Sequence, residues 1–156
     1  MERSDIEDLK LSAAILDLID QGFSFPLNEF SEIVHSMETY RFGHDVESSE
    51  FKNHETTYER DYMTGSKQPD ADVLYCCALS CYTSKDSAES ELIKILERHK
   101  KYRLKLGNSL LYGLLNPEDG FVNKPDHKTH FDFFQKKCCD MKSNFKLFKI
   151  LKPSGE

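Results

Sequence analysis

Residues 73–82 read VLYCCALSCY and form the most apolar run in the chain. Nine of these ten residues are hydrophobic, compared with 38% of the whole sequence. A run without a polar face is expected to be buried on every side. Val, Tyr and Cys favour a strand, whereas Ala and Leu favour a helix, and Asp70 just upstream can cap a first helical turn. We therefore expect a buried helix at the centre of the protein.

The segments on either side of this run mostly repeat apolar residues at helical spacing. Ser4 and Glu7 match a capping box, Gly22 can end the first helix, and Pro26 suits the first turn of a second helix that stops at Gly43. The ranges expected to be helical are 4–21, 26–42, 87–106, 126–142 and 143–152. The spacing predicts an all-α fold, a compact single-domain bundle of five to seven helices over residues 1–156. The alternative is an α+β fold with strands at 73–78, 110–115 and 145–151.

Residues 44–70 differ from the rest because they hold many charges and few aliphatic residues. Phe51, Tyr58 and Tyr62 recur there at helical positions. The segment is therefore either a thin amphipathic helix over 48–63 or a mobile acidic loop held down by these three aromatics. Long loops are frequent binding elements, so the three aromatics are our candidate contacts for a protein partner.

Charge is divided unevenly along the chain, which has a net charge of −6. Residues 1–75 carry 6 basic and 17 acidic residues, whereas residues 76–156 carry 15 basic and 10 acidic ones. Two stretches, 94–105 and 136–152, are strongly basic and can bind phosphates of nucleic acid or of phospholipid headgroups if they share a face. The candidate anion-binding residues are Arg98, Lys100, Lys101, Arg103, Lys142, Lys146 and Lys149.

The five cysteines are expected to be reduced and to pack as small apolar side chains. The first ten residues are acidic and polar, unlike a signal peptide, which indicates a cytoplasmic, reducing compartment. The longest apolar run has about ten residues, short of the roughly 20 that a membrane span requires. No transmembrane segment is therefore expected.

Metal binding and cysteine catalysis are the weaker interpretations. On a helix Cys77 and Cys81 would share a face, as would His127 and His130, but the tight Cys-x2-Cys spacing of structural zinc sites is missing. Cys138 lies about two helical turns beyond His130, too far for a direct contact along one helix. We therefore expect no metal and no cofactor.

The sequence contains none of the glycine-rich phosphate loops, nucleophile elbows or metalloprotease motifs that identify common enzymes. The function that we expect is a small intracellular, non-catalytic protein-binding module, such as an adaptor, an inhibitor or an effector-like regulator. The alternative is an anion-binding protein that uses the lysine-rich residues. A further alternative is a Cys/His metal-binding protein or a cysteine-dependent enzyme.

Overall fold

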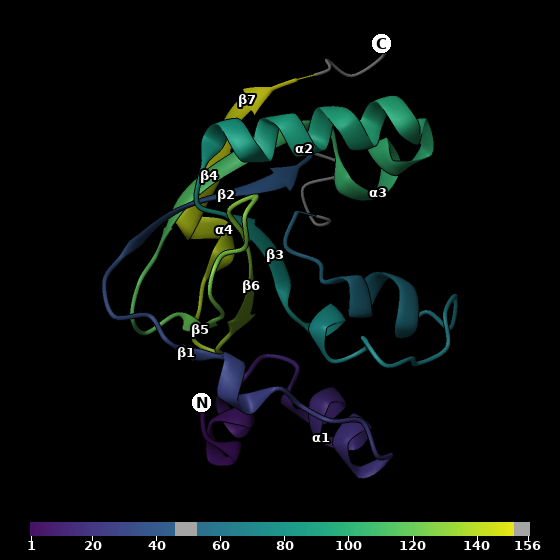
Figure 1. Ribbon diagram of the computed structural model, residues 1–156, viewed down its shortest axis with the longest axis vertical. Coiled ribbons are helices and arrows are strands. Elements are labelled where there is room, and N and C mark those ends of the chain that lie inside the picture. Colours follow the sequence, from purple (N-terminus) through teal and green to yellow (C-terminus); the bar gives the residue numbers. More distant parts are fainter. Residues whose placement is uncertain (46–52, 152–156) are drawn as a thin grey trace.

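The computed structural model describes residues 1–45 and 53–151, and its centre is an antiparallel β-sheet (Figure 1). The seven strands follow the order β1-β5-β6-β3-β2-β4-β7. Their bounds are β1 (Ser31–Glu32), β2 (Met37–Gly43), β3 (Leu79–Tyr82), β4 (Ser109–Leu115), β5 (Gly120–Val122), β6 (His130–Gln135) and β7 (Phe145–Ile150). The predicted all-α bundle of five to seven helices is therefore wrong, and the mixed α+β alternative is closer to the structure.

The helices are few and mostly short. The α-helices are α1 (Ser12–Asp20), α2 (Lys85–Arg98), α3 (Arg103–Leu106) and α4 (Met141–Asn144). Shorter helical turns are η1 (Arg3–Asp8), η2 (Leu27–Glu29), the π-helical turn η4 (Tyr58–Tyr62), η5 (Tyr75–Cys77) and η6 (Lys100–Tyr102). Helix α2 covers one end of the sheet, and α1 lies at the opposite end of the molecule (Figure 1). In the part of the chain that the structure describes, no helix combines the length and the apolar character needed to cross a bilayer.

Strand β2 replaces the helix predicted over 26–42. Every residue of β2 pairs with β4, from Met37 opposite Leu115 to Gly43 opposite Ser109. Side chains alternate between the two faces of a strand, and β2 is rich in the aromatic residues that favour strands. Val34, within the range predicted to be helical, is 78% exposed. The apolar spacing of this segment fitted a helix only by coincidence.

Strands β6 and β7 replace the helices predicted over 126–142 and 143–152. Strand β7 pairs with β4, but the register shifts between Leu110 and Leu111. Leu110 faces Lys149 and Leu111 faces Leu147, so Phe148 is the extra residue of a β-bulge. A bulge breaks the two-residue alternation. The strand therefore contains adjacent apolar residues, Leu147 and Phe148, which do not follow the alternating pattern expected of a strand.

Most of the run at 73–82 is buried, but Ser80 is exposed, Tyr75 and Cys76 are half-buried, and the run is not a helix throughout. Val73 and Leu74 are almost fully buried, the short turn η5 follows, and the chain then enters β3 in the middle of the sheet. Cys81 is fully buried within β3. The alternative strand at 73–78 is also wrong, because the strand begins at Leu79.

Helix α2 confirms part of the helix predicted over 87–106. The Ser84 hydroxyl, rather than that of Ser87, caps the helix by accepting a hydrogen bond from the Ser87 amide at 3.3 Å. The helix buries Ala88, Leu92 and Leu96 against the sheet and ends at Arg98. The chain continues through η6 and α3 to Gly107, whose φ of +90° suits glycine.

Strands β2 and β3 are neighbours that pair at a single position, Tyr40 opposite Tyr82. On the other side of each strand the pairing is extensive: β2 pairs with β4 over seven residues and β3 pairs with β6 over four. The sheet is therefore two well-paired halves that diverge along the line between β2 and β3. Polar groups along this line need partners other than a neighbouring strand.

The buried position of β3 gives a matched test of the fold. Leu79 is 1% exposed and Leu104 is 73% exposed. Replacing Leu79 with Ala should lower the free energy of unfolding by about 2–5 kcal/mol, because it leaves a cavity in the core. Leu104→Ala should change it by less than about 0.5 kcal/mol. Urea denaturation measures both values, and similar losses in the two variants would contradict the assignment of β3 to the core.

Candidate anion-binding cleft

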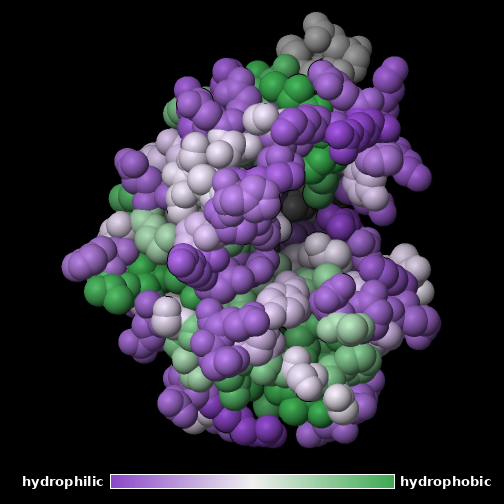
Figure 2. All heavy atoms as spheres, in the orientation of Figure 1, coloured by the Kyte–Doolittle hydropathy of each residue, from purple (hydrophilic) through white to green (hydrophobic). Residues whose placement is uncertain are grey.

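A cleft of about 230 Å³ opens where β2 and β3 diverge. Figure 2 shows the surface hollowed at this level, between the α2–α3 end of the molecule and its lower half. The cleft is lined by residues of β2, of segment 53–60, of β3 with the preceding residue, and of the α2–α3 region. The lining residues are Arg41, Phe42, Asn53, Glu55, Thr56, Thr57, Arg60, Ala78, Leu79, Ser80, Tyr82, Ile95, Lys105 and Leu106.

Arg41 reaches from β2 across the gap to β3 and to segment 53–60. Its Nη1 donates to the Ser80 carbonyl oxygen at 2.7 Å, and its Nη2 donates to the Asn53 carbonyl oxygen at 3.0 Å. The residue is only 5% exposed, and its Nε atom is buried without a hydrogen-bond partner. The guanidinium therefore satisfies the Ser80 carbonyl group of β3, which does not pair with β2, and it also links the sheet to Asn53.

No carboxylate of the described residues forms an ion pair with Arg41. Its two oxygen acceptors are uncharged carbonyls. A guanidinium stays protonated in proteins, and a buried charge is costly unless it is paired. Among the described residues, Arg41 is thus a buried positive charge without a carboxylate counterion, and it lines an open cleft.

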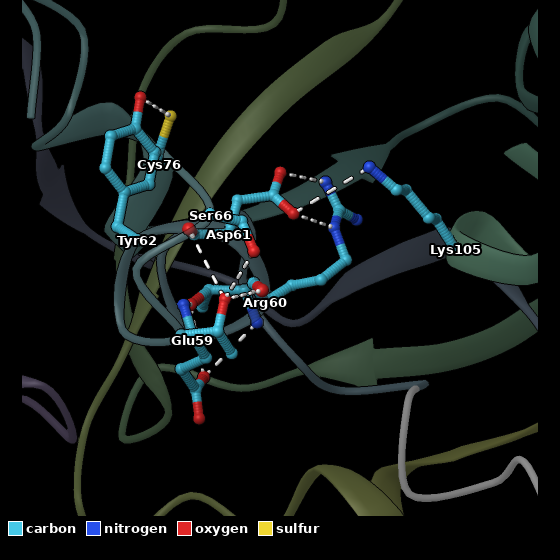
Figure 3. Close-up of polar contacts among 9 residues, drawn as sticks. Glu59, Arg60, Asp61, Tyr62, Ser66, Cys76 and Lys105 are labelled. Carbon is cyan, nitrogen blue, oxygen red and sulfur yellow. Dashed lines mark hydrogen bonds and ion pairs between the residues drawn. The ribbon is translucent and has the colours of Figure 1, made fainter. Parts of the chain in front are cut away.

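Two further cations, Arg60 and Lys105, line the cleft, and Asp61 lies between them (Figure 3). Arg60 Nε lies 3.0 Å from Asp61 Oδ1, and Lys105 Nζ lies 4.0 Å from the same oxygen. The hydrogen bond from Arg60 is the main cause that lowers the pKa of Asp61. Asp61 therefore stays ionised at neutral pH and compensates one of the two cations. Among the described lining residues Glu55 is the single carboxylate, so this described lining is net positive.

A reciprocal pair of hydrogen bonds fixes the turn that carries Arg60. The Thr56 hydroxyl accepts from the Glu59 amide at 3.1 Å, and Glu59 Oε1 accepts from the Thr56 amide at 3.2 Å. This is the arrangement of a capping box, which satisfies free amides at the start of a helical turn. Figure 3 shows Glu59 turned away from Asp61, so it does not compete for Arg60.

Part of the cleft lining is an apolar wall. The rings of Phe42 and Tyr82 stack with their centroids 5.3 Å apart, and Ile95 and Leu106 line the cleft as well. A cleft with apolar walls and a few converging polar groups is the usual form of a small-molecule site. Its size and composition suit a small ligand with an anionic group at one end and an apolar or aromatic body.

The aromatics predicted to contact a protein lie elsewhere. Tyr62 is 8% exposed, and its ring stacks on Tyr58 at a centroid distance of 5.8 Å. Its hydroxyl donates to Asp70 at 3.1 Å, and both tyrosines belong to the core beneath η5. Phe51 lies outside the described residues. Tyr62 therefore offers little surface to a partner.

The structure places the predicted anion-binding residues in two separate regions (Figure 1). Arg98, Lys100, Lys101 and Arg103 lie where α2 ends, in η6 and in α3, whereas Lys142, Lys146 and Lys149 lie in α4 and β7. Lys149 pairs with Glu89 near the start of α2, at 2.8 Å. Arg98 is nine residues further along, which corresponds to about 13 Å of helix. The two sets do not form one basic face.

The weak metal candidates do not converge on one another. Cys81 faces Phe131 across the β3–β6 pair and Tyr82 faces His130, so the side chains of Cys81 and His130 point to opposite faces of the sheet. Cys77 is buried in η5, and His127 lies in an exposed loop. Within residues 1–45 and 53–151, no group of three or more His, Cys, Asp or Glu side chains is placed to hold a metal ion.

Cys139 and Ser80 do not show the features of an activated nucleophile. Burial is the main cause that raises the pKa of the Cys139 thiol, to about 12, which keeps it protonated at neutral pH. Ser80 Oγ lies 2.9 Å from His130 Nε2, a pair that our sequence analysis did not find. Asp132 Oδ1 lies 3.9 Å from His130 Nε2, the nitrogen that also faces Ser80. In a catalytic triad the carboxylate binds the second ring nitrogen, Nδ1, instead.

Arg41 was also missed from the sequence. The helix assigned to 26–42 placed it at a helix end, where an arginine is an ordinary surface residue. One local signal was present, since Arg41 stands between Tyr40 and Phe42 in a segment of residues that favour strands. Side chains alternate between the two faces of a strand, so Arg41 points to the face opposite that of Tyr40 and Phe42. The Arg41 side chain is buried on that face.

The comparisons with protein-family models, with curated proteins and with solved structures found no match to this chain.

The charge of Arg41 also acts on His54, and this gives a pH prediction. Burial, then Arg41 and Lys10, lower the pKa of His54 from 6.5 to about 4, and Asp140 opposes the shift. The His54 imidazole therefore becomes protonated below about pH 6.5 in the unfolded chain, but only below about pH 4 in the folded protein. The free energy of unfolding should fall as the pH drops through this window, by about 3 kcal/mol in total.

His54→Phe should remove this part of the pH dependence, because phenylalanine does not titrate. His35→Phe at an exposed histidine is the matched control and should leave it in place. Urea denaturation from about pH 4 to about pH 7 measures the effect. An unchanged pH profile in His54→Phe would show that His54 titrates normally in the folded protein.

Proposed function

We propose that the protein acts by binding a small organic anion, with a carboxylate or phosphate group held by Arg41 and its body against the apolar wall. The observation that carries this proposal is the buried Arg41 guanidinium, which has an unpartnered Nε and forms no ion pair in the described residues. The planar fork of a guanidinium matches carboxylate and phosphate oxygens in two-point contacts. A bound anion would supply the missing counterion.

The other lining residues support the same ligand class. Arg60 and Lys105 add positive charge at the cleft, and the hydroxyl groups of Thr56, Thr57 and Ser80 add polar contacts. Phe42, Ile95 and Leu106 add apolar surface at the cleft for the body of the ligand. The five unpaired thiols fit a protein of a reducing compartment such as the cytoplasm. The proposal retains the anion-binding alternative from the sequence but moves it to different residues.

Isothermal titration with phenyl phosphate and with benzoate tests this proposal. Benzyl alcohol, which has a similar ring and no charge, is the control ligand. We expect saturable binding of at least one of the anions and none of the alcohol. Arg41→Gln should weaken the binding by at least about tenfold, because hydrogen bonds to a charged group are lost. Lys105→Gln should weaken it by about threefold, the effect of a partly exposed charge.

Lys85→Gln is the matched control for Lys105→Gln. Each lysine is about half exposed, and each lies 4.0 Å from an aspartate, Asp86 and Asp61 respectively. Lys85 begins α2, about 15 Å along the helix from the cleft residue Ile95. If Arg41→Gln does not fold, the ligand affinities of Lys105→Gln and Lys85→Gln can still be compared to test the proposed site. Equal binding by these two variants, or no binding of either anion up to about 1 mM, would disprove the proposed site.

A further inference from the structure

The second feature that indicates binding is the open edge of the sheet at β7, at the end beside the start of α2 (Figure 1). Among the described strands, β7 is the last one of the sheet and pairs only with β4. The opposite edge strand, β1, has just two residues, whereas β7 has six. An edge strand presents a row of backbone amide and carbonyl groups that can pair with an added strand.

The side chains of β7 are unusually apolar for an exposed edge. Leu147, Phe148 and Ile150 are 48%, 47% and 43% exposed, respectively. The Phe148 ring lies 5.7 Å from Tyr40 and 6.0 Å from Tyr112, which places an aromatic patch on the sheet beside this edge. A strand added to β7 would therefore gain backbone hydrogen bonds and would cover apolar side chains on both faces.

The charge of this edge indicates which strand fits. Lys146 donates only to the Lys142 carbonyl oxygen, at 3.4 Å, and within the described ranges neither Lys142 nor Lys146 forms an ion pair. Lys149 pairs with Glu89. A second copy of β7 would bring lysines against lysines, and the bulge at Phe148 disturbs a straight ladder. Both features discourage self-pairing, whereas acidic side chains would complement the lysines.

We propose that β7 is the docking edge for an extended segment of a partner protein, in which Asp or Glu alternates with apolar residues. The partner adds a strand beside β7, its acidic side chains meet Lys142 and Lys146, and its apolar side chains cover Leu147 and Ile150. This inference is independent of the Arg41 cleft. Strands β2 and β4 and the aromatic patch separate the two sites.

An eight-residue peptide of alternating Glu and Val, with blocked ends, tests this inference. Its Lys-Val counterpart is the control. Fluorescence anisotropy should show binding of the acidic peptide only, weakening as salt is added. Hydrogen exchange of the complex should show new protection in residues 145–150. The double variant Lys142→Glu/Lys146→Glu should weaken the binding by at least about fivefold.

Lys124→Glu is the surface control, because Lys124 is exposed and lies between β5 and β6, at least four strands from β7. Lys124→Glu should bind the acidic peptide normally. Lys105→Gln, which changes the cleft, should also bind the peptide normally, so the two proposed sites can be tested separately. Three outcomes would overturn the inference. They are equal binding of the two peptides, new protection confined to residues outside 145–150, and a lysine-dependent dimer of the protein that excludes the peptide.

Discussion

A single buried guanidinium links the two halves of the sheet. Strands β2 and β3 share one paired position, and beyond it Arg41 binds the carbonyl oxygens of Ser80 and Asn53. This contact satisfies backbone groups that the diverging strands leave open, and it also fixes segment 53–60 beside the sheet. The cleft exists because side-chain hydrogen bonds replace the ladder there. The cost of this solution is a buried positive charge that no carboxylate of residues 1–45 and 53–151 pairs with.

The elements around the cleft are positioned by ordinary packing and capping. Helix α2 buries Leu92 and Leu96 beneath itself and places Ile95 on the apolar wall. The Thr56–Glu59 box holds the turn that carries Arg60. Sites supported by strands, helices and capped turns need little reorganisation when a ligand binds. The edge at β7 depends on different contacts, so the two proposed sites can act separately.

The sequence predicted which segments are buried better than it predicted their conformation. Most of the run at 73–82 is interior, and α2 was found because its cap and its apolar stripe are both local signals. The strands were missed because their partners are distant in sequence: β2 is fixed by β4, about 70 residues away. The bulge at Phe148 interrupts the alternating pattern by which β7 could have been recognised as a strand. The divergence of β2 and β3 beyond the Tyr40–Tyr82 pair, which creates the cleft, cannot be read from the sequence of either strand alone. Tertiary pairing overrode local propensity at each of these places.

The most direct measurement of the central claim observes the Arg41 Nε–H group itself. In a 1H–15N spectrum of uniformly labelled protein, with the resonance assigned by its loss in Arg41→Lys, phenyl phosphate should shift the Nε–H signal saturably downfield. The reason is that the buried Nε, which has no hydrogen-bond partner among the described residues, would gain a charged acceptor. An Nε–H signal that stays in place while other residues bind the anion would contradict the account, because Arg41 would then be a structural link alone.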